Sequence, residues 1–511
     1  MFIMSYDAVV MGAGLGGLCA AFELSKNGIK TLLLEQHNLP GGFASSFVRG
    51  RFEFEPSLHE IPDPATTKDI RSVIRYLKDD AELDIDFLEI PEAYRVILTE
   101  KNLNVRVPFG WDNLIDVIAD NVPGSREPLE NYRDLCIEVQ AAFGYLNNHQ
   151  DDLSYLKLLR EHGNFIRTGS YTAEEVADAL KIPQAAKDIL YPYWCYLGVP
   201  MERVSFSLWA SMLNAYMSHS AAIPTLRSHE ISSAFIHAIE AQGGECRMNS
   251  RVDKILTENG EVRGVRLSSG EEISCPNVVC NSSPTRVYSS LISPSSDIPK
   301  MAHQNVNSRI HGFSLAVVYL GLDIDHKSLG LEDYSYFIAP HMDTEELYEA
   351  SHDYKSENIM QASVCLNVGN PGCSPPGTCI LSMTVGQSDG SWDKILPVDY
   401  FEAKKVIADI MINQFESATG VDLRSHIEEI EVATPQTFAR YTGAWNGLVY
   451  GYEPEPWDGI IPRVLGKEKE NYFKGLVFCG GYSYRAHGYS SSILSGKAAA
   501  EDILSSRGDK S

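Results

Sequence analysis

Positive charge is scarce in this sequence. Its 511 residues include 43 Lys and Arg against 68 Asp and Glu, which gives a formal net charge of −25. Binding to nucleic acid phosphates and docking on anionic lipid both need clustered basic side chains, so we expect no nucleic acid partner and no strong electrostatic attachment to a membrane. Long apolar runs are also missing, since none approaches the roughly 18 residues of a membrane-spanning helix.

The sequence also has no CxxC pair of cysteines, and we expect no secretory leader. The ten cysteines are scattered and none stands in a CxxC pair, so the sequence predicts neither a zinc site nor a disulfide framework. The first residues, MFIMSYDAVVMGAG, have no basic region and no cleavage site of a signal peptide. Apolar residues make up 44% and charged residues 22%, as in a soluble globular enzyme. We therefore expect a cytoplasmic protein with reduced thiols and no metal site.

A glycine motif lies near the N-terminus. Residues 6–11, YDAVVM, are predicted to form a buried strand, and GAGLGG follows over residues 12–17. The next segment, LCAAFELSKNG, has the pattern of an amphipathic helix that stops at residues 27–28. Residues 29–34 are predicted to form a second apolar strand, and Glu35 stands at its end. This order of strand, glycine turn, helix and strand is the context in which GxGxxG binds a dinucleotide.

Each glycine of the motif has a physical role. Gly12 permits a tight turn, Gly14 lets a pyrophosphate approach the backbone, and Gly17 allows the helix to pack closely on the strand. The helix N-terminus offers N–H donors to the phosphates, and the Glu35 carboxylate accepts hydrogen bonds from the ribose hydroxyls. An acid at this position disfavours a 2′-phosphate, so NADP is not expected and FAD or NAD remain. The predicted contacts are Gly12, Gly14, Leu15, Gly16, Gly17 and Glu35.

Two short segments after the second strand resemble a large flavoprotein superfamily. QHNLPGGFASSF (36–47) has the glycine pair of its extended FAD fingerprint, and RFEFEPSLHEI (51–61) has its Pro-Ser pair. The superfamily includes phytoene desaturases, carotenoid cis–trans isomerases, retinol saturases, flavin amine oxidases and Rab GDP-dissociation inhibitors. The resemblance implies that the cofactor is FAD, with Gly41, Gly42 and Ser45 beside it.

Two later segments carry the same resemblance. Residues 232–300 carry a second family segment, which reads as a helix, a turn, a strand, a hairpin and a buried strand, and the family implies a backbone contact from Val252 to the adenine. The closing segment, GLVFCGGYSYRAHGYSSSILSGK (475–497), reads as a strand, a loop along the flavin, and a helix that starts near residue 489 or 490. The N–H groups of that helix would face the N1–C2 edge of the flavin. The implied contacts are Gly481, Gly488, Tyr489 and Ser490.

The sequence departs from the family pattern at several places. Phe43 stands where the family usually has Arg or Lys, Glu55 replaces a glycine, and Ser228-His229 replaces a glycine pair. Most polyene-acting relatives have Pro and Gly where this chain has Arg485 and His487. An imidazole and a fixed cation suit proton delivery or oxyanion stabilisation on an oxygenated substrate such as an enone, so these two are the candidate catalytic residues. The structural alternative is that His487 caps the loop and Arg485 forms a surface ion pair.

The expected fold class is α/β with two domains. A Rossmann-like FAD-binding domain would be built from the discontinuous segments 1–95, 226–300 and 471–511. An α+β substrate-binding domain with a mixed sheet would be built from residues 96–225 and 301–470. The chain has no second GxGxxG, so an external electron donor or acceptor such as NAD(P)H would have to bind transiently.

One aromatic stretch has two interpretations. Residues 191–217, YPYWCYLGVPMERVSFSLWASMLNAYM, are rich in Tyr, Trp and Met. They are either the core of a helical layer or the wall of an apolar tunnel that holds a small-molecule substrate.

The main functional prediction follows from the resemblance. We expect a FAD-dependent oxidoreductase that desaturates, saturates or isomerises C=C bonds of an extended apolar polyene or isoprenoid-like substrate, with or without an oxygenated end. The alternatives are a reductive cyclase of the polyene tetramate type, a flavin amine oxidase, and a non-catalytic prenyl-binding chaperone like the GDP-dissociation inhibitors. Peripheral membrane contact, which some relatives use, stays open, and the sequence predicts no oligomeric state.

Overall fold

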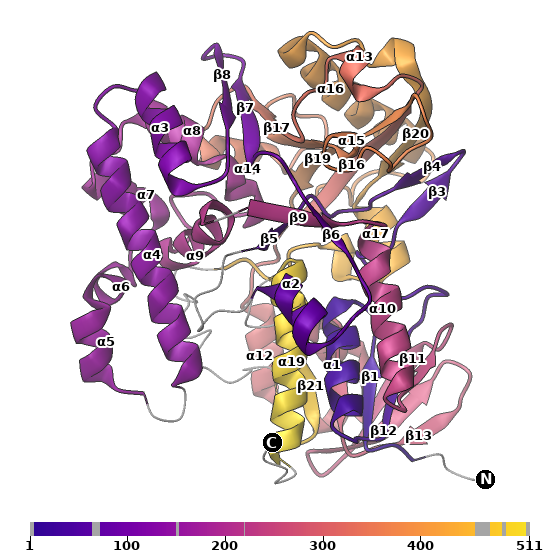
Figure 1. Cartoon of the computed structure of the whole chain (residues 1–511). Helices are drawn as coiled ribbons and strands as arrows, with labels where there is room; N and C mark the ends of the chain where they lie inside the picture. Colours follow the sequence, from indigo (N-terminus) through magenta and orange to yellow (C-terminus); the bar gives the residue numbers. More distant parts are fainter. Residues whose placement is uncertain are drawn as a thin grey trace.

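The molecule contains a parallel sheet, a larger mixed sheet and a helical layer. Figure 1 shows the parallel sheet with its helices in the lower part, the mixed sheet in the upper part, and the helices α3 to α9 on the left. This computed structural model describes residues 5–63, 72–149, 153–218, 220–454, 471–482 and 487–506. Among these residues, none of the helices has the length and apolar character that crossing a bilayer requires.

The parallel sheet has five strands in the order β10-β2-β1-β14-β21. Its strands come from three separated parts of the chain and are buried on both faces, which explains their continuous apolar sequences. Helices α1, α10 and α19 cover one face, and α1 packs against both α10 and α19. The bounds are β1 Ala8–Met11, β2 Thr31–Leu34, β10 Glu245–Arg247, β14 Val278–Cys280, β21 Leu476–Phe478, α1 Leu15–Lys26, α10 Ser228–Ala241 and α19 Tyr489–Ser506.

A four-stranded sheet, β13-β12-β11-β15, covers the other face of the parallel sheet. Val9 and Leu32 of the parallel sheet share a buried cluster with Ile255 and Val265 of this second sheet. Strands β12 and β13 form the hairpin that the sequence predicts around residue 270. The bounds are β11 Val252–Glu258, β12 Glu261–Leu267, β13 Glu272–Ser274 and β15 Ile292–Ser293.

The larger sheet has seven strands in the order β20-β16-β19-β18-β17-β7-β8. Only the β17 and β7 pair is parallel, so the sheet is mixed. Helix α16 (Tyr400–Thr419) packs on one face, and the aromatic core shared with α3, α4 and α9 lies on the other. The bounds are β7 Tyr94–Leu98, β8 Leu103–Val107, β16 Ser314–Leu322, β17 Ser335–Ala339, β18 Gln361–Cys365, β19 Cys379–Gln387, β20 Ile427–Ala433, α3 Trp111–Asn121, α4 Arg126–Asn148 and α9 Phe206–Met217.

Short elements join the two halves. Strands β5 (Ile61–Asp63) and β6 (Phe87–Glu89) both pair with β9 (Ser220–Pro224), and β3 (Phe47–Arg49) pairs with β4 (Phe52–Phe54). The remaining helices are α2 Val73–Arg75, α5 Tyr155–Glu161, α6 Gly163–Thr168, α7 Ala173–Ala179, α8 Gln184–Leu190, α11 Pro284–Arg286, α12 Lys300–Asn307, α13 His326–Leu329, α14 Thr344–Ala350, α15 Leu366–Gly369 and α17 Pro435–Thr442. The predicted α/β class, with a discontinuous Rossmann-like sheet and a mixed second sheet, is confirmed, while the predicted domain boundaries stay a prediction.

Candidate functional site

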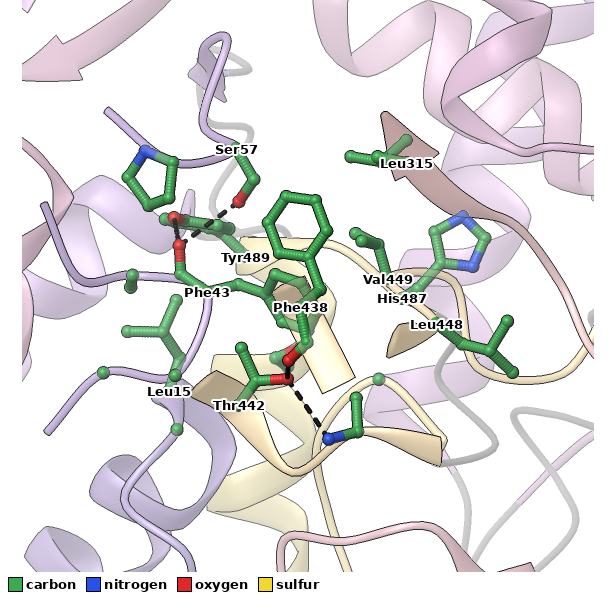
Figure 2. Close-up of a pocket in the computed structure, with 18 of the residues that line it drawn as sticks. Leu15, Phe43, Ser57, Leu315, Phe438, Thr442, Leu448, Val449, His487 and Tyr489 are labelled. Atoms are coloured by element: carbon green, nitrogen blue, oxygen red, sulfur yellow. Dashed lines mark hydrogen bonds between the residues drawn. The ribbon is translucent and has the colours of Figure 1, made fainter. Parts of the chain in front are cut away.

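A cavity of about 1160 Å³ runs between the parallel sheet and the mixed sheet. Its glycine-lined part is bordered by the N-terminal motif, by the end of β2 and by the start of α19, and contains Gly12, Gly14, Leu15, Gly16, Glu35, Gly41, Gly42, Ser45, Val252, Gly481, Gly488, Tyr489 and Ser490. Its aromatic part contains His59, Glu60, Tyr196, Tyr216, Thr384, Tyr450 and His487. In Figure 2, Leu15 lies on one side of the cavity, and Leu315, Leu448, Val449 and His487 lie on the other.

The glycines of the N-terminal motif lie where a side chain would collide with the backbone. Gly12 has a φ of +98°, which favours glycine. A Cβ on Gly16 would lie 2.7 Å from the Gly480 nitrogen, and a Cβ on Gly17 would lie 2.0 Å from the Gly12 carbonyl oxygen. Gly17 is the one predicted contact in this motif that does not line the cavity among the described residues. Gly17 instead allows α1 to pack closely against the end of β1.

The carboxylate of Glu35 ties the end of β2 to the glycine turn. Its Oε2 accepts a hydrogen bond from the Ala13 N–H at 2.7 Å, and its Oε1 accepts one from the His37 N–H at 2.8 Å. The Gly41 N–H donates to the Ala13 carbonyl at 2.7 Å. The predicted ribose ligand is therefore also the group that fixes the relative positions of the two glycine turns.

Helix α1 begins with open backbone donors. Among the described residues, no side chain caps its N-terminus at Gly14, and no acidic residue stands in its first turn. The first N–H groups of a helix have no partner within the helix and carry partial positive charge, so a phosphate fits at this position. The prediction of a helix starting near residue 489 is confirmed, because α19 begins at Tyr489, and its first residues line the same cavity.

Phe43 gives an apolar contact where the family usually has a cation. Its ring lies 5.3 Å from the ring of Phe438, measured between centroids. Its carbonyl oxygen accepts hydrogen bonds from the Tyr489 hydroxyl at 2.8 Å and the Ser57 hydroxyl at 3.2 Å, which Figure 2 shows as dashed lines. The backbone of the glycine fingerprint is thereby fastened to the start of the closing helix.

Two departures from the family pattern contact each other. The Glu55 carboxylate accepts hydrogen bonds from the Ser228 N–H at 2.8 Å and from the Ser228 hydroxyl at 2.6 Å. Burial raises the pKa of Glu55 to about 7, while these bonds oppose the rise. Because the Glu55 carboxyl binds the first residue of α10, the helix starts at Ser228, earlier than the helix predicted from residue 232. Glu55 and Ser228 thus form a hydrogen-bonded contact at two positions where the family has glycine.

The aromatic stretch contributes to the core with some residues and lines the cavity with others, while its binding of a substrate stays a prediction. Tyr191, Trp194, Phe206 and Trp209 are buried in the core beneath the mixed sheet. The side chains that line the cavity from this stretch are Cys195, Tyr196, Leu197, Leu208, Ser211, Met212, Ala215 and Tyr216. The stretch is therefore core on one side and cavity wall on the other.

His487 is held at the wall of the cavity and is only 8% exposed. Its Nε2 donates a hydrogen bond to the Tyr196 carbonyl oxygen at 2.9 Å. Its ring stacks on that of Tyr450, with centroids 4.1 Å apart and planes at 19°. Arg485, the other candidate catalytic residue, lies outside the described residues.

Sequence reasoning missed a chain of polar side chains in the aromatic part. The Tyr196 hydroxyl donates to Glu60 Oε1 at 2.9 Å and lies 3.1 Å from His59 Nδ1, while His59 Nε2 lies 3.2 Å from the Thr384 hydroxyl. Burial lowers the pKa of His59 to about 4 and raises the pKa of Glu60 to about 8. The available signal was the pair of titratable residues, His59 and Glu60, which stands one residue after the Pro-Ser pair that the family shares.

The glycine-lined part fits FAD. It combines glycines that leave the backbone open, the start of two helices, and a carboxylate at the end of β2, and these suit a pyrophosphate, a flavin edge and a ribose. The apolar side chains farther along the cavity suit an isoalloxazine ring and a non-polar substrate.

Comparisons with known proteins agree with this geometry. A family model described as flavin containing amine oxidoreductase matches residues 15–504. The chain belongs to this family. It is a FAD-dependent oxidoreductase, so the predicted cofactor and enzyme class are confirmed, and the alternative of a non-catalytic chaperone is set aside.

Individual relatives span most of this flavoprotein. All-trans-retinol 13,14-reductase of Danio rerio is 27% identical over 89% of this chain and 78% of its own length. Chloroplastic prolycopene isomerase of Daucus carota is 25% identical over 98% of this chain and 80% of its own length. Among solved structures, cyclohexylamine oxidase from Brevibacterium oxydans has a TM-score of 0.62 at 16% identity, covering 99% of this chain and 100% of its own, which shows the shared fold.

Proposed function

We propose that this flavoprotein reduces, oxidises or isomerises C=C bonds of an extended apolar polyene or isoprenoid-like substrate. The observation that carries the proposal is the continuity of the cavity, which passes from the glycine-lined part into a wall of aromatic and aliphatic side chains. Such a wall favours a long apolar molecule beside the flavin. The printed names of the relatives, a retinol reductase and a prolycopene isomerase, support the same substrate class.

We assign the holding of the cofactor to the glycine-lined part. FAD, when bound, supplies the exchange of a hydride with the substrate. The chain itself would bind the pyrophosphate with the first N–H groups of α1, the ribose with Glu35, and the flavin edge with the start of α19. The aromatic part would orient the substrate and exclude water. The cofactor-binding residues in this proposal are Gly12, Gly14, Leu15, Gly16, Glu35, Gly41, Gly42, Ser45, Val252, Gly481, Gly488, Tyr489 and Ser490, and Gly17 acts on the cofactor site through the packing of α1.

His487 is the described residue that we propose as catalytic, together with Arg485. The imidazole lies at the cavity wall one residue before Gly488 and is held by the Tyr196 carbonyl and the Tyr450 ring. A side chain fixed in this way can move a proton to or from a substrate atom without first being ordered.

An anaerobic experiment tests the proposed reaction class. The purified holoenzyme, chemically reduced, is mixed with candidate polyenes and enones, and flavin reoxidation and product mass are followed together. A gain of two mass units means reduction, an unchanged mass means isomerisation, and the oxidised enzyme tests desaturation in the same way. Bleaching of the oxidised flavin by primary amines, with no response to any polyene or enone, would contradict the proposal and favour an amine oxidase.

A further inference from the structure

One buried carboxyl group beside the cavity has an oxygen without a hydrogen-bond partner. Glu60 lines the aromatic part and is only 5% exposed. Its Oε1 accepts the hydrogen bond from Tyr196, whereas its Oε2 is buried and has no partner among the described residues. A buried polar atom without a hydrogen-bond partner destabilises the folded protein, so the unpaired oxygen of Glu60 beside the cavity points to a ligand that binds it.

One assignment of protons completes the hydrogen-bond chain with Glu60 Oε1 as the acceptor at its end. In this assignment Tyr196 gives its only hydroxyl hydrogen to Glu60 Oε1, and its oxygen accepts the hydrogen bond from His59 Nδ1. Neutral His59 carries one ring proton, and its Nε2 therefore accepts from the Thr384 hydroxyl. Every donor in the chain then has an acceptor, except for a proton on Glu60 Oε2. The network ends in one unused donor if Glu60 is in its acid form.

The surroundings of Glu60 keep it in the acid form at neutral pH. Burial raises the pKa of Glu60 to about 8, and no cation among the described residues opposes the rise. Burial also raises the pKa of the Cys195 thiol and of the nearby tyrosine hydroxyls, and it lowers the pKa of His59 to about 4. Among the groups facing Glu60, only its own carboxyl thus changes charge between pH 6 and 9. These groups are His59, Tyr193, Cys195, Tyr196, Tyr216, Tyr334 and Tyr450.

We propose that Glu60 binds an oxygen atom of the substrate through a hydrogen bond from its Oε2–H. The substrate is then an apolar polyene or isoprenoid-like molecule that carries a carbonyl or hydroxyl group, and pure hydrocarbons are poor ligands. This inference rests on the proposed function and adds to it the group that the aromatic part recognises. A site built to hydrogen-bond an oxygen discriminates against an analogue that lacks it, because its own donor is left unpaired.

A matched pair of small probes tests this assignment. The first is β-ionone, an apolar conjugated ketone, and the second is the triene in which a methylene group replaces the ketone oxygen. Neither probe titrates. Binding of each to the oxidised holoenzyme is measured from the change in the flavin absorbance, at pH 6 and at pH 9, so that no turnover is needed.

Wild-type protein is expected to bind the ketone roughly tenfold more tightly than the hydrocarbon at pH 6. The preference should disappear at pH 9, because a Glu60 carboxylate has no proton to donate. The Glu60→Gln variant keeps a donor that does not titrate, so its preference should be present at both pH values. The Glu60→Leu variant should show no preference at either pH while it still binds the hydrocarbon.

Glu55→Gln is the matched control, since Glu55 is also buried but does not line the cavity. Like the wild type, this variant is expected to bind the ketone more tightly than the hydrocarbon at pH 6 and to lose that preference at pH 9. Equal binding of both probes to the wild type at pH 6, or a preference that survives in Glu60→Leu, would overturn the role of Glu60 and leave the proposed function standing. If neither probe changes the flavin absorbance of the wild type, the proposed apolar substrate site is wrong, and so is the role of Glu60.

Discussion

In the glycine-lined part of the cavity the polar contacts come from the backbone, whereas in the aromatic part they come from side chains. The first part relies on N–H groups of helix ends and on glycines that keep the backbone accessible, and the Glu35 carboxylate is hydrogen-bonded to the backbone there. The second part relies on a chain of titratable side chains joined by Tyr196. A backbone contact is lost only when the chain is displaced, while a side-chain contact is lost by one substitution.

This difference separates two kinds of specificity. The backbone donors suit a fixed anionic ligand such as a dinucleotide, which is common to the whole family. The side chains of the aromatic part can change one at a time without altering the fold. We therefore expect substitutions in the first part to act on flavin retention, and substitutions in the second part to act on ligand choice and turnover.

The largest effect is expected from Gly17→Ala. The new Cβ would lie 2.0 Å from the Gly12 carbonyl oxygen, in the tight contact between α1 and β1. Since both atoms belong to the backbone frame, α1 must move away from the parallel sheet. We expect FAD affinity to fall at least about 100-fold, so that the purified protein is nearly colourless. Flavin absorbance per mole of protein measures this.

Gly163→Ala is the control for that experiment. A Cβ at Gly163 meets nothing within 4 Å, and the residue lies in the helical layer far along the chain from the motif. The variant should retain flavin as the wild type does. Full flavin content in Gly17→Ala would show that the close contact of α1 with β1 is not required for the cofactor site.

A smaller loss is expected from Glu35→Ala. The substitution removes the acceptor for two backbone N–H groups, those of Ala13 and His37, as well as the proposed ribose contact. A hydrogen bond to a charged group contributes about 1.5–3 kcal/mol, so the dissociation constant of FAD should rise by about 10- to 100-fold. Fluorescence titration of the apoprotein with FAD measures it. Unchanged affinity would refute the role of Glu35.

Most of the glycine-lined part was predictable because its residues are close along the chain. The strand, turn, helix and strand over residues 6–35 appear in the structure as β1, α1 and β2, with ends that differ by a few residues. Local pattern and glycine geometry suffice to place such elements. Gly17 has the packing position that the motif predicts, and it does not line the cavity among the described residues.

The aromatic part could not be assembled from the sequence. Tyr196 and Glu60 are separated by 136 residues along the chain, and His59 and Thr384 by 325. No local periodicity reports such a contact, since it depends on how the mixed sheet is placed over the cavity. The contact between Glu55 and Ser228 is not predictable from the sequence for the same reason, although each residue by itself departs from the family pattern.

His487→Ala should affect turnover more than cofactor binding. The backbone around Gly488 and the start of α19 stay in place, so FAD affinity should change less than about threefold, while turnover with the native substrate falls by about tenfold or more. The His487→Gln variant offers an N–H for the Tyr196 carbonyl but cannot exchange a ring proton. If glutamine restores turnover, His487 only positions Tyr196, and the proposed catalytic role is wrong.

The smallest effect is expected on stability, from Glu60→Gln. The pKa of Glu60 is about 8 in the folded protein and about 4.5 when the group is exposed, so the folded state binds this proton more tightly than the unfolded state. The contribution of this proton to the free energy of unfolding is fully present below pH 4.5, and it is lost as the pH rises through 8. Glutamine does not titrate, so the variant should gain in melting temperature relative to the wild type between pH 5 and pH 9. We expect this relative gain to be about 2–4 °C, with flavin content unchanged. A difference in melting temperature that stays constant over this range would mean that Glu60 is ionised in the folded protein, and the aromatic part would then present a carboxylate in place of a hydrogen-bond donor.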